Sequence, residues 1–175
     1  MTYNISIGGA KWDKVDKNTT DLQGFPTNLK LRRLYVMFCG EYSHNLDSKK
    51  RMSLPSRLRE ELGESVVMTK NVDRCVSLYP IERWNAFTAK LDTLPETETR
   101  MVKRFLYSAA FETTVDTQGR ILISPGLCEY AGLTKSVKVI GVGDHIEIWD
   151  ENSWIKESSS ENTAEITDLL IKLGF

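Results

Sequence analysis

Residues 46–55 read LDSKKRMSLP, and residues 115–124, 69 positions later, read VDTQGRILIS. Each stretch has an Asp followed four residues later by an Arg, then an apolar run and a short segment that ends at a Gly. Asp47 and Arg51 correspond to Asp116 and Arg120. A pattern that recurs at a fixed offset is typical of one supersecondary unit used twice. The sequence therefore predicts an internally duplicated fold.

Each copy predicts the same order of elements: strand, turn, strand, short helix, strand, turn, strand and longer helix. In the first copy, alternating polarity favours a strand over residues 38–46. A turn at 47–50 and a strand at 51–54 would make the opening a hairpin, followed by a helix over 56–62. So few strands rarely close a core alone. We expect an α+β fold in which two units pack about a pseudo-two-fold axis.

The chain divides by composition and periodicity into five segments. Residues 1–36 are polar and predict a poorly ordered extension, with a possible edge strand at 29–36, so that Met37 is a candidate start of the working protein. The remaining segments are a first unit with its helix at 37–91, a linking helix at 92–109, a second unit at 110–157 and a C-terminal helix at 158–175. An apolar stripe on the last helix predicts packing on the body or on a neighbouring subunit.

The composition excludes several classes of protein. The 175 residues carry a net charge of −1 and no apolar run of about 20 residues, which a membrane span needs. Cys39, Cys75 and Cys128 are odd in number and lack a C-x-x-C spacing, so we expect reduced thiols in a cytosolic protein. Cys39 and Cys75 are expected to be buried. No metal ligand set, cofactor motif, small-molecule site or catalytic triad is evident, so the sequence does not predict an enzyme.

The repeated turn allows two interpretations. In the first, the Asp accepts backbone N–H groups and pairs with the Arg, which only fastens a hairpin. In the second, the Asp orients the Arg fork toward a phosphate or a guanine edge of DNA. Four further basic residues crowd the first copy, namely Lys49, Lys50, Arg57 and Arg59. Such a local basic patch on a neutral protein favours nucleic-acid binding.

Residues 37–59 and 116–123, together with 139–142 and 146–149, resemble the MraZ family of bacterial transcriptional regulators. The resemblance implies two tandem AbrB-like swapped-hairpin (double-split β-α-β) units. It also implies a ring-like homo-oligomer, cytoplasmic and nucleoid-associated, that binds repeated boxes of double-stranded DNA in the promoter of the division and cell-wall gene cluster. The expected DNA-binding residues are Asp47, Lys49, Lys50, Arg51, Arg57, Arg59, Asp116, Gln118 and Arg120.

The chain departs from the family pattern at two positions of interest. Lys50 stands where the family often has Gly, and Cys128 stands where a basic residue is common. The second unit is therefore less basic than the first. Another function on the same fold is a protein-interaction module, antitoxin-like or scaffolding, which would show a stable protein partner and no salt-dependent affinity for DNA.

Overall fold

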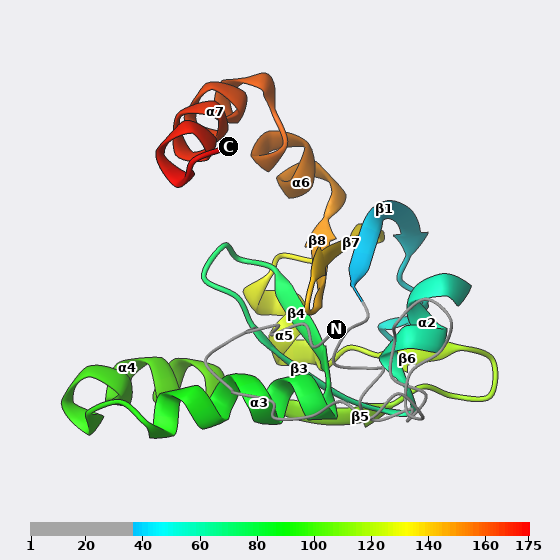
Figure 1. Ribbon diagram of the computed structural model, residues 1–175. Coiled ribbons are helices and arrows are strands. Elements are labelled where there is room, and N and C mark those ends of the chain that lie inside the picture. The colour runs from blue at the N-terminus through cyan, green and yellow to red at the C-terminus, as the bar shows by residue number, and fades with distance from the viewer. Residues whose placement is uncertain (1–36) are drawn as a thin grey trace, which may run out of the picture. The chain divides into compact units, whose positions relative to one another are not determined.

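The computed structural model describes residues 37–175, apart from the side chains of residues 160–162. Residues 37–175 belong to one compact unit (Figure 1). The predicted extension at 1–36, its edge strand and the start at Met37 lie outside the described residues.

Within residues 37–175, eight strands and six helices follow in the order that the duplication predicts. The strands are β1 (Phe38–Asn45), β2 (Arg51–Ser53), β3 (Ser65–Lys70), β4 (Val76–Pro80), β5 (Phe111–Thr114), β6 (Arg120–Leu122), β7 (Ser136–Gly143) and β8 (Ile146–Asp150). The helices are α2 (Ser56–Leu62), α3 (Ile81–Asp92), α4 (Glu96–Tyr107), α5 (Pro125–Tyr130), α6 (Glu151–Glu157) and α7 (Ser160–Leu173). The mixed α and β composition is confirmed. The assignment to the AbrB-like swapped-hairpin class stays a prediction.

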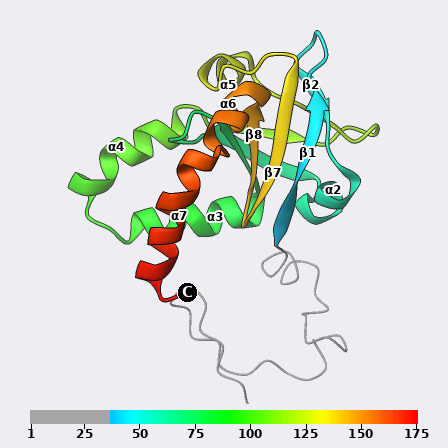
Figure 2. The same cartoon turned by 90° about the horizontal axis from the view of Figure 1, so that it is seen from above.

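Strands of both repeats are mixed in one antiparallel sheet. Its order is β1-β7-β8-β4-β3-β5, while β2 and β6 form a separate two-stranded ribbon. When each strand is replaced by its counterpart in the other repeat, the order becomes β5-β3-β4-β8-β7-β1, which is the original order reversed. β1 lies beside β7 (Figure 2), just as its counterpart β5 lies beside β3. The pairing therefore follows the pseudo-two-fold relation that the repeat implies.

The opening of each repeat differs from the predicted hairpin. β1 and β2 flank the first turn, but β1 pairs with β7 over eight residues and β2 pairs with β6 over three. Local hydrogen bonds close the turn itself. The prediction of a local hairpin was wrong because each strand finds its partner in the other repeat, which a pattern within one repeat cannot show.

Side chains on the two faces of the sheet form separate cores. One face packs against α2, α5 and the ribbon, and its fully buried members include Leu58, Leu62, Met68, Ile121 and Leu127. The opposite face is covered by α3 and α4 at one end and by α6 at the other. The main core draws on both repeats, so neither repeat encloses it alone.

The tryptophans on the second face are core residues. Trp84 of α3 packs with Tyr79 and Leu106, and Trp149 of β8 packs with the half-buried Trp154 of α6. None of the helices within residues 37–175 is both long enough and apolar enough to span a bilayer.

Candidate nucleic-acid interface

The first repeated turn is built around the carboxylate of Asp47. One oxygen accepts the backbone N–H groups of Lys49 and Arg51 at 2.8 and 2.9 Å. The other accepts Nε of Arg51 at 2.8 Å and lies 2.8 Å from its Nη2. The N–H of Lys50 donates to the Asp47 carbonyl at 3.0 Å, which closes the turn. The Asp thus fixes both the backbone of the turn and the direction of the Arg fork.

The second turn repeats this geometry. Asp116 accepts the N–H groups of Gln118 and Arg120 at 2.9 and 2.8 Å. Its other oxygen accepts Nε of Arg120 at 2.8 Å and lies 2.7 Å from Nη2. The N–H of Gly119 closes the turn on the Asp116 carbonyl at 2.8 Å. Two turns of different sequence therefore hold their Arg residues in the same way.

The hydrogen bonds also act on the ionisation of the two carboxylates. The pKa of Asp47 and that of Asp116 are both held below the usual range, first by the backbone N–H of the Arg four residues on and then by its side chain. Each carboxylate therefore stays charged at neutral pH. Each Arg keeps an exposed part, since the side chains of Arg51 and Arg120 are 32% and 28% exposed.

The ribbon brings the two Arg residues together. In its register Arg51 faces Leu122, Met52 faces Ile121, and Ser53 faces Arg120. Side chains alternate between the faces of a strand, and Met52 and Ile121 are buried. The outward face of the ribbon, which we call the ribbon face, therefore consists of Arg51, Ser53, Arg120 and Leu122. The two Arg residues are diagonal neighbours, with Cα atoms roughly 7–8 Å apart.

Reciprocal backbone hydrogen bonds connect each turn to the other repeat. The N–H of Leu54 donates to the carbonyl of Gly119 at 2.9 Å, and the N–H of its counterpart Ile123 donates to the carbonyl of Lys50 at 3.0 Å. Because each turn depends on a strand of the other repeat, the two turns form one surface rather than two independent loops.

Arg59 lies at the second turn, although it belongs to the first repeat. A Cβ added to Gly119 would collide with the guanidinium of Arg59, which shows that this side chain lies directly over the glycine. The counterpart pair is Cys128, which is equivalent to Arg59, and Lys50, which is equivalent to Gly119. Burial raises the pKa of the Cys128 thiol, and the nearby charge of Lys50 partly opposes that effect. Because Arg59 lies over Gly119, the second turn has more positive charge beside it than the sequence of its own repeat suggests.

The other predicted residues lie around these turns. Lys49 and Gln118 are exposed at equivalent turn positions. Arg57 is exposed on α2, where its Nη2 lies 3.7 Å from Sγ of Cys39. The prediction that Cys39 is buried was wrong, because it lies on the exposed side of edge strand β1, whereas Cys75 is buried as expected.

Sequence reasoning missed two members of the ribbon face, Ser53 and Leu122. Leu122 is 44% exposed despite its apolar side chain. The available signal was the alternation along residues 51–53 and 120–122, which places each of these residues on the same face as an Arg. Within residues 37–175 no group of three or more His, Cys, Asp or Glu side chains could hold a metal ion.

Comparison with known proteins agrees with the duplication. The family model described as "MraZ protein, putative antitoxin-like" matches twice in tandem, over residues 37–105 and 106–170. The "Transcriptional regulator MraZ" of Caldicellulosiruptor bescii is 49% identical over 128 residues, which cover 72% of this chain and 90% of the relative. The protein of the same description from Acetivibrio thermocellus is 44% identical over 142 residues, covering 79% and 99%, respectively. The one from Clostridium tetani is 42% identical over 141 residues, covering 79% and 99%. The tandem match and these identities show that the chain belongs to the MraZ family.

Proposed function

We propose that the chain is a DNA-binding transcriptional regulator that recognises specific sequences with its two Asp-Arg turns and its ribbon face. The observation that carries this proposal is the identical hydrogen bonding of Arg51 and Arg120 on a single two-stranded ribbon. The names of the relatives, each a transcriptional regulator, support the same function. The two units then correspond to the AbrB-like swapped-hairpin class.

The shape and chemistry of the ribbon suit the major groove. That groove admits a two-stranded β-ribbon, and an Arg fork can bind O6 and N7 of a guanine at once. Each Asp reduces the freedom of its Arg before DNA arrives, which lowers the cost of ordering the side chain on binding. Arg51 and Arg120 would therefore select bases, with Ser53 between them as a further polar contact.

The residues around the ribbon would bind the backbone. Lys49 and Lys50 flank the first Arg, and Arg59 flanks the second, so each turn has at least one cation beside its Arg. Contacts with phosphates fix the position of a protein on the duplex and make its affinity depend on salt. Arg57 and Gln118 would extend this surface.

The wider assignment follows the family. The chain would act as a cytoplasmic, nucleoid-associated homo-oligomer, ring-shaped, on repeated boxes in the promoter of the division and cell-wall gene cluster. An oligomer would place several ribbons on consecutive boxes, which raises the overall affinity without any new contact.

The test is fluorescence anisotropy with the DNA upstream of the protein's own gene and a scrambled duplex, each over a salt series. The wild type is expected to prefer the upstream DNA. The double variant Arg51→Ala, Arg120→Ala should lose about 25-fold or more, because each bidentate base contact contributes roughly 1–3 kcal/mol. A matched control, Lys90→Ala with Lys156→Ala, removes two exposed charges from α3 and α6 and should change affinity less than about threefold by the general field alone.

Equal and weak binding to both duplexes would contradict sequence recognition. Unchanged affinity in the double Arg variant would contradict the assigned surface. In the first case the antitoxin-like description of the family would direct the search to a protein partner.

A further inference from the structure

The residues that precede β3 and β7 bring opposite charges to the two turns. The N–H of Leu46, just before the first turn, donates to the carbonyl of Lys135 at 2.8 Å. The N–H of its counterpart Val115 donates to the carbonyl of Glu64 at 3.3 Å. Each acceptor lies one residue before a strand, β7 or β3. Lys135 and Glu64 are therefore structural counterparts, with a cation beside the first turn and a carboxylate beside the second.

Lys135 is attached to a well-held loop. The offset between the repeats grows from 69 residues at the turns to 71 at these strands, because Leu133 and Thr134 lengthen the loop before β7. Leu133 is buried, and Thr134 donates its N–H and its hydroxyl to Asp150 at 3.3 and 2.7 Å. Asp150 is itself buried. The backbone that carries Lys135 is thus fixed before a ligand arrives, which lowers the cost of ordering on binding.

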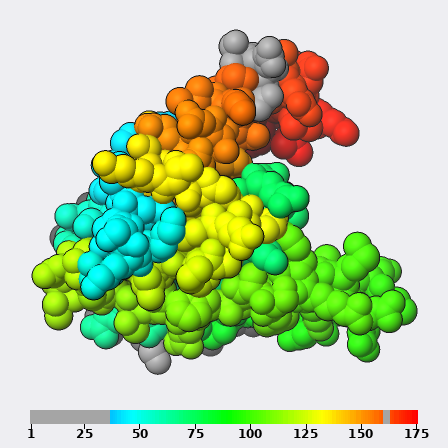
Figure 3. Space-filling view, turned by 180° about the vertical axis from the view of Figure 1, so that it is seen from behind, coloured from blue at the N-terminus to red at the C-terminus, as the bar shows by residue number. Residues whose placement is uncertain are grey.

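Lys135 and Lys50 line one open pocket beside the first turn. It has a volume of about 500 Å³, and the other residues that line it are Leu46, Asp47, Ser48 and Thr134. β1, in cyan, and β7, in yellow, lie side by side on the face that Figure 3 shows, and they bring the two sides of the pocket together.

The pocket carries an excess of positive charge. The carboxylate of Asp47 is already engaged by the guanidinium and the backbone N–H of Arg51. Among the ion pairs of the described side chains, none involves Lys50 or Lys135. Two ammonium groups therefore remain available to an anion.

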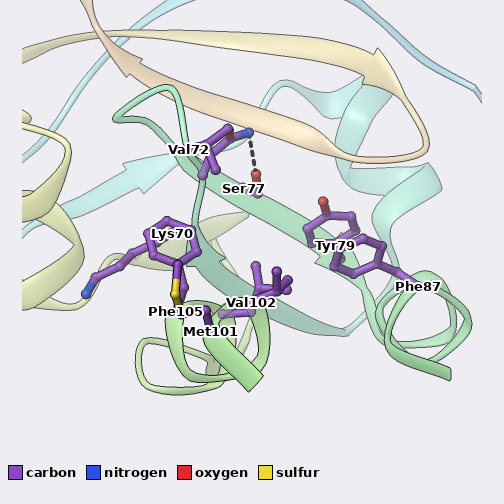
Figure 4. Close-up of a pocket in the computed structure, with 10 residues that line it drawn as sticks. Lys70, Val72, Ser77, Tyr79, Phe87, Met101, Val102 and Phe105 are labelled. Carbon is purple, nitrogen blue, oxygen red and sulfur yellow. Dashed lines mark hydrogen bonds between the residues drawn. The ribbon is translucent and has the colours of Figure 1, made fainter. Parts of the chain in front are cut away.

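The hollow beside α4 has a different character. It has a volume of about 420 Å³, and most of its lining is apolar, with Tyr79, Phe87 and Met101 among the contributors (Figure 4). Lys70 lies at its edge, and its Nζ is 5.1 Å from the ring centre of Tyr130. Its single lysine is thus held against an aromatic ring, so the pocket beside the first turn is the one suited to an anion.

The groups that line this pocket suit a phosphate. Each lysine ammonium offers three N–H donors and a full positive charge, and Ser48 adds a hydroxyl. Lys50 immediately precedes Arg51 of the ribbon, so an anion in the pocket lies beside the Arg that would select bases. On a duplex bound by the ribbon face, the anion that borders the groove at that place is a backbone phosphate.

We propose that Lys50, Lys135 and Ser48 bind a phosphate of the DNA backbone, and that Glu64 repels a phosphate at the equivalent place beside the second turn. This inference deepens the proposed function and rests on it. The two turns then contact the duplex unequally, although their Asp-Arg pairs are alike. Because phosphate contacts fix how a protein is oriented on the duplex, the inequality favours one orientation of the ribbon on its site.

The contact can be measured by fluorescence anisotropy with the upstream and the scrambled duplex over a salt series. Lys135→Ala should lower the slope of log K against log salt by about 0.9 for each subunit in contact. Between 50 and 200 mM salt, wild-type affinity should therefore fall about three- to fourfold more than that of the variant, per contact. Both duplexes should be affected equally, since phosphates carry no sequence information. Lys90→Ala, at an exposed position on α3, should leave the slope unchanged.

The reciprocal substitution is Glu64→Lys, which places a cation beside the second turn. It should tighten binding to both duplexes and raise the salt slope by about 0.9 per subunit. Lys135 and Glu64 are both exposed and hold the turns through their carbonyls, so the fold should survive, as circular dichroism will check. Lys50→Ala combined with Lys135→Ala should lose less than the product of the two single losses, because both lysines bind one phosphate.

Three results would overturn the proposal. A wild-type salt slope in Lys135→Ala would show that the pocket does not contact DNA. Weaker binding by Glu64→Lys would show that no phosphate lies at the equivalent place beside the second turn. Calorimetry with inorganic phosphate at constant ionic strength tests the other source of this group. Saturable binding that Lys135→Ala abolishes, together with an unchanged DNA slope, would make the pocket a site for a free anion.

These failures are distinct from failure of the proposed function. If the pocket does not bind a phosphate of DNA, the wild type still prefers the upstream duplex, and the Arg51→Ala, Arg120→Ala variant still loses affinity. If the chain is not a sequence-specific regulator, that preference is absent from the wild type itself.

Discussion

Lys50 is the residue of the interface whose backbone conformation is least favourable for an amino acid that has a side chain. Its φ is +59°, and its counterpart Gly119 has a φ of +75°. A residue with a Cβ in the left-handed region lowers the free energy of unfolding by about 1–2 kcal/mol. Lys50→Gly removes that strain, but glycine also raises the conformational entropy of the unfolded chain, which lowers the free energy of unfolding by about 0.5–1 kcal/mol. The net expectation is a gain of about 0.5–1 kcal/mol, or a rise in Tm of about 1–4 °C for a chain of this size.

The matched control for this substitution is Lys50→Ala, which removes the charge and keeps the strained φ. Thermal and urea unfolding should rank Lys50→Gly above both the wild type and Lys50→Ala. Anisotropy should not separate the two variants: both lose the same phosphate contact, and the slope of log K against log salt falls by about 0.9 in each. If Lys50→Gly is no more stable than Lys50→Ala, the strain argument fails. If the two variants keep the wild-type salt slope, Lys50 does not bind phosphate.

Three further perturbations probe other parts of the fold. Gly141→Ala places a Cβ against the backbone of Cys39 in β1. Because paired strands cannot move apart without losing hydrogen bonds, chemical denaturation should show a free energy of unfolding lower by about 1–3 kcal/mol or more. Gly126→Ala, where the added Cβ meets open space, should change it little. Asp150→Ala removes the acceptor for the N–H groups of Asn152 and Ser153 and should cost about 1–2 kcal/mol, whereas Asp150→Asn, whose amide oxygen can still accept these bonds, should keep most of that stability. Burial acts to lower the pKa of His145, but the carboxylates of Glu147 and Asp144, the latter 2.7 Å from Nδ1, outweigh it and raise that pKa. The resulting stability is present below about pH 6.5 and is lost as pH rises through the folded pKa. His145→Gln should therefore flatten the fall in urea midpoint between pH 6 and 8.

The sequence alone predicts the elements well, because their signals are local. The alternation in 38–46, the Gly that ends each short helix and the apolar stripe of α3 each appear within a few residues. The Asp-Arg pairing is equally local, since both members lie in one turn. The 69-residue offset adds the pseudo-two-fold relation, because it maps every strand of one repeat onto a strand of the other.

The parts that the sequence could not give depend on pairing between the repeats. No pattern within residues 37–62 shows that β1 pairs with β7 or that β2 pairs with β6. Without that pairing, the diagonal placement of Arg51 and Arg120 and the position of Arg59 over Gly119 cannot be deduced. Sequence identifies the residues of each turn, whereas the exchange of strands decides which residues share a surface.

The exchange of strands also explains the two departures from the family pattern as one change. At the second turn a long cation on the helix, Arg59, covers a residue without a side chain, Gly119. At the first turn the helix offers the short Cys128, and the turn supplies the long cation, Lys50. Each turn thus has one long cation at this place, from the helix at the second turn and from the turn itself at the first. The positive charge beside each Arg is thereby kept while its origin moves from helix to turn. In a dimer of two identical single-repeat chains, any substitution would change both turns at once. Because the two repeats are fused in one chain, the first turn can change while the second does not.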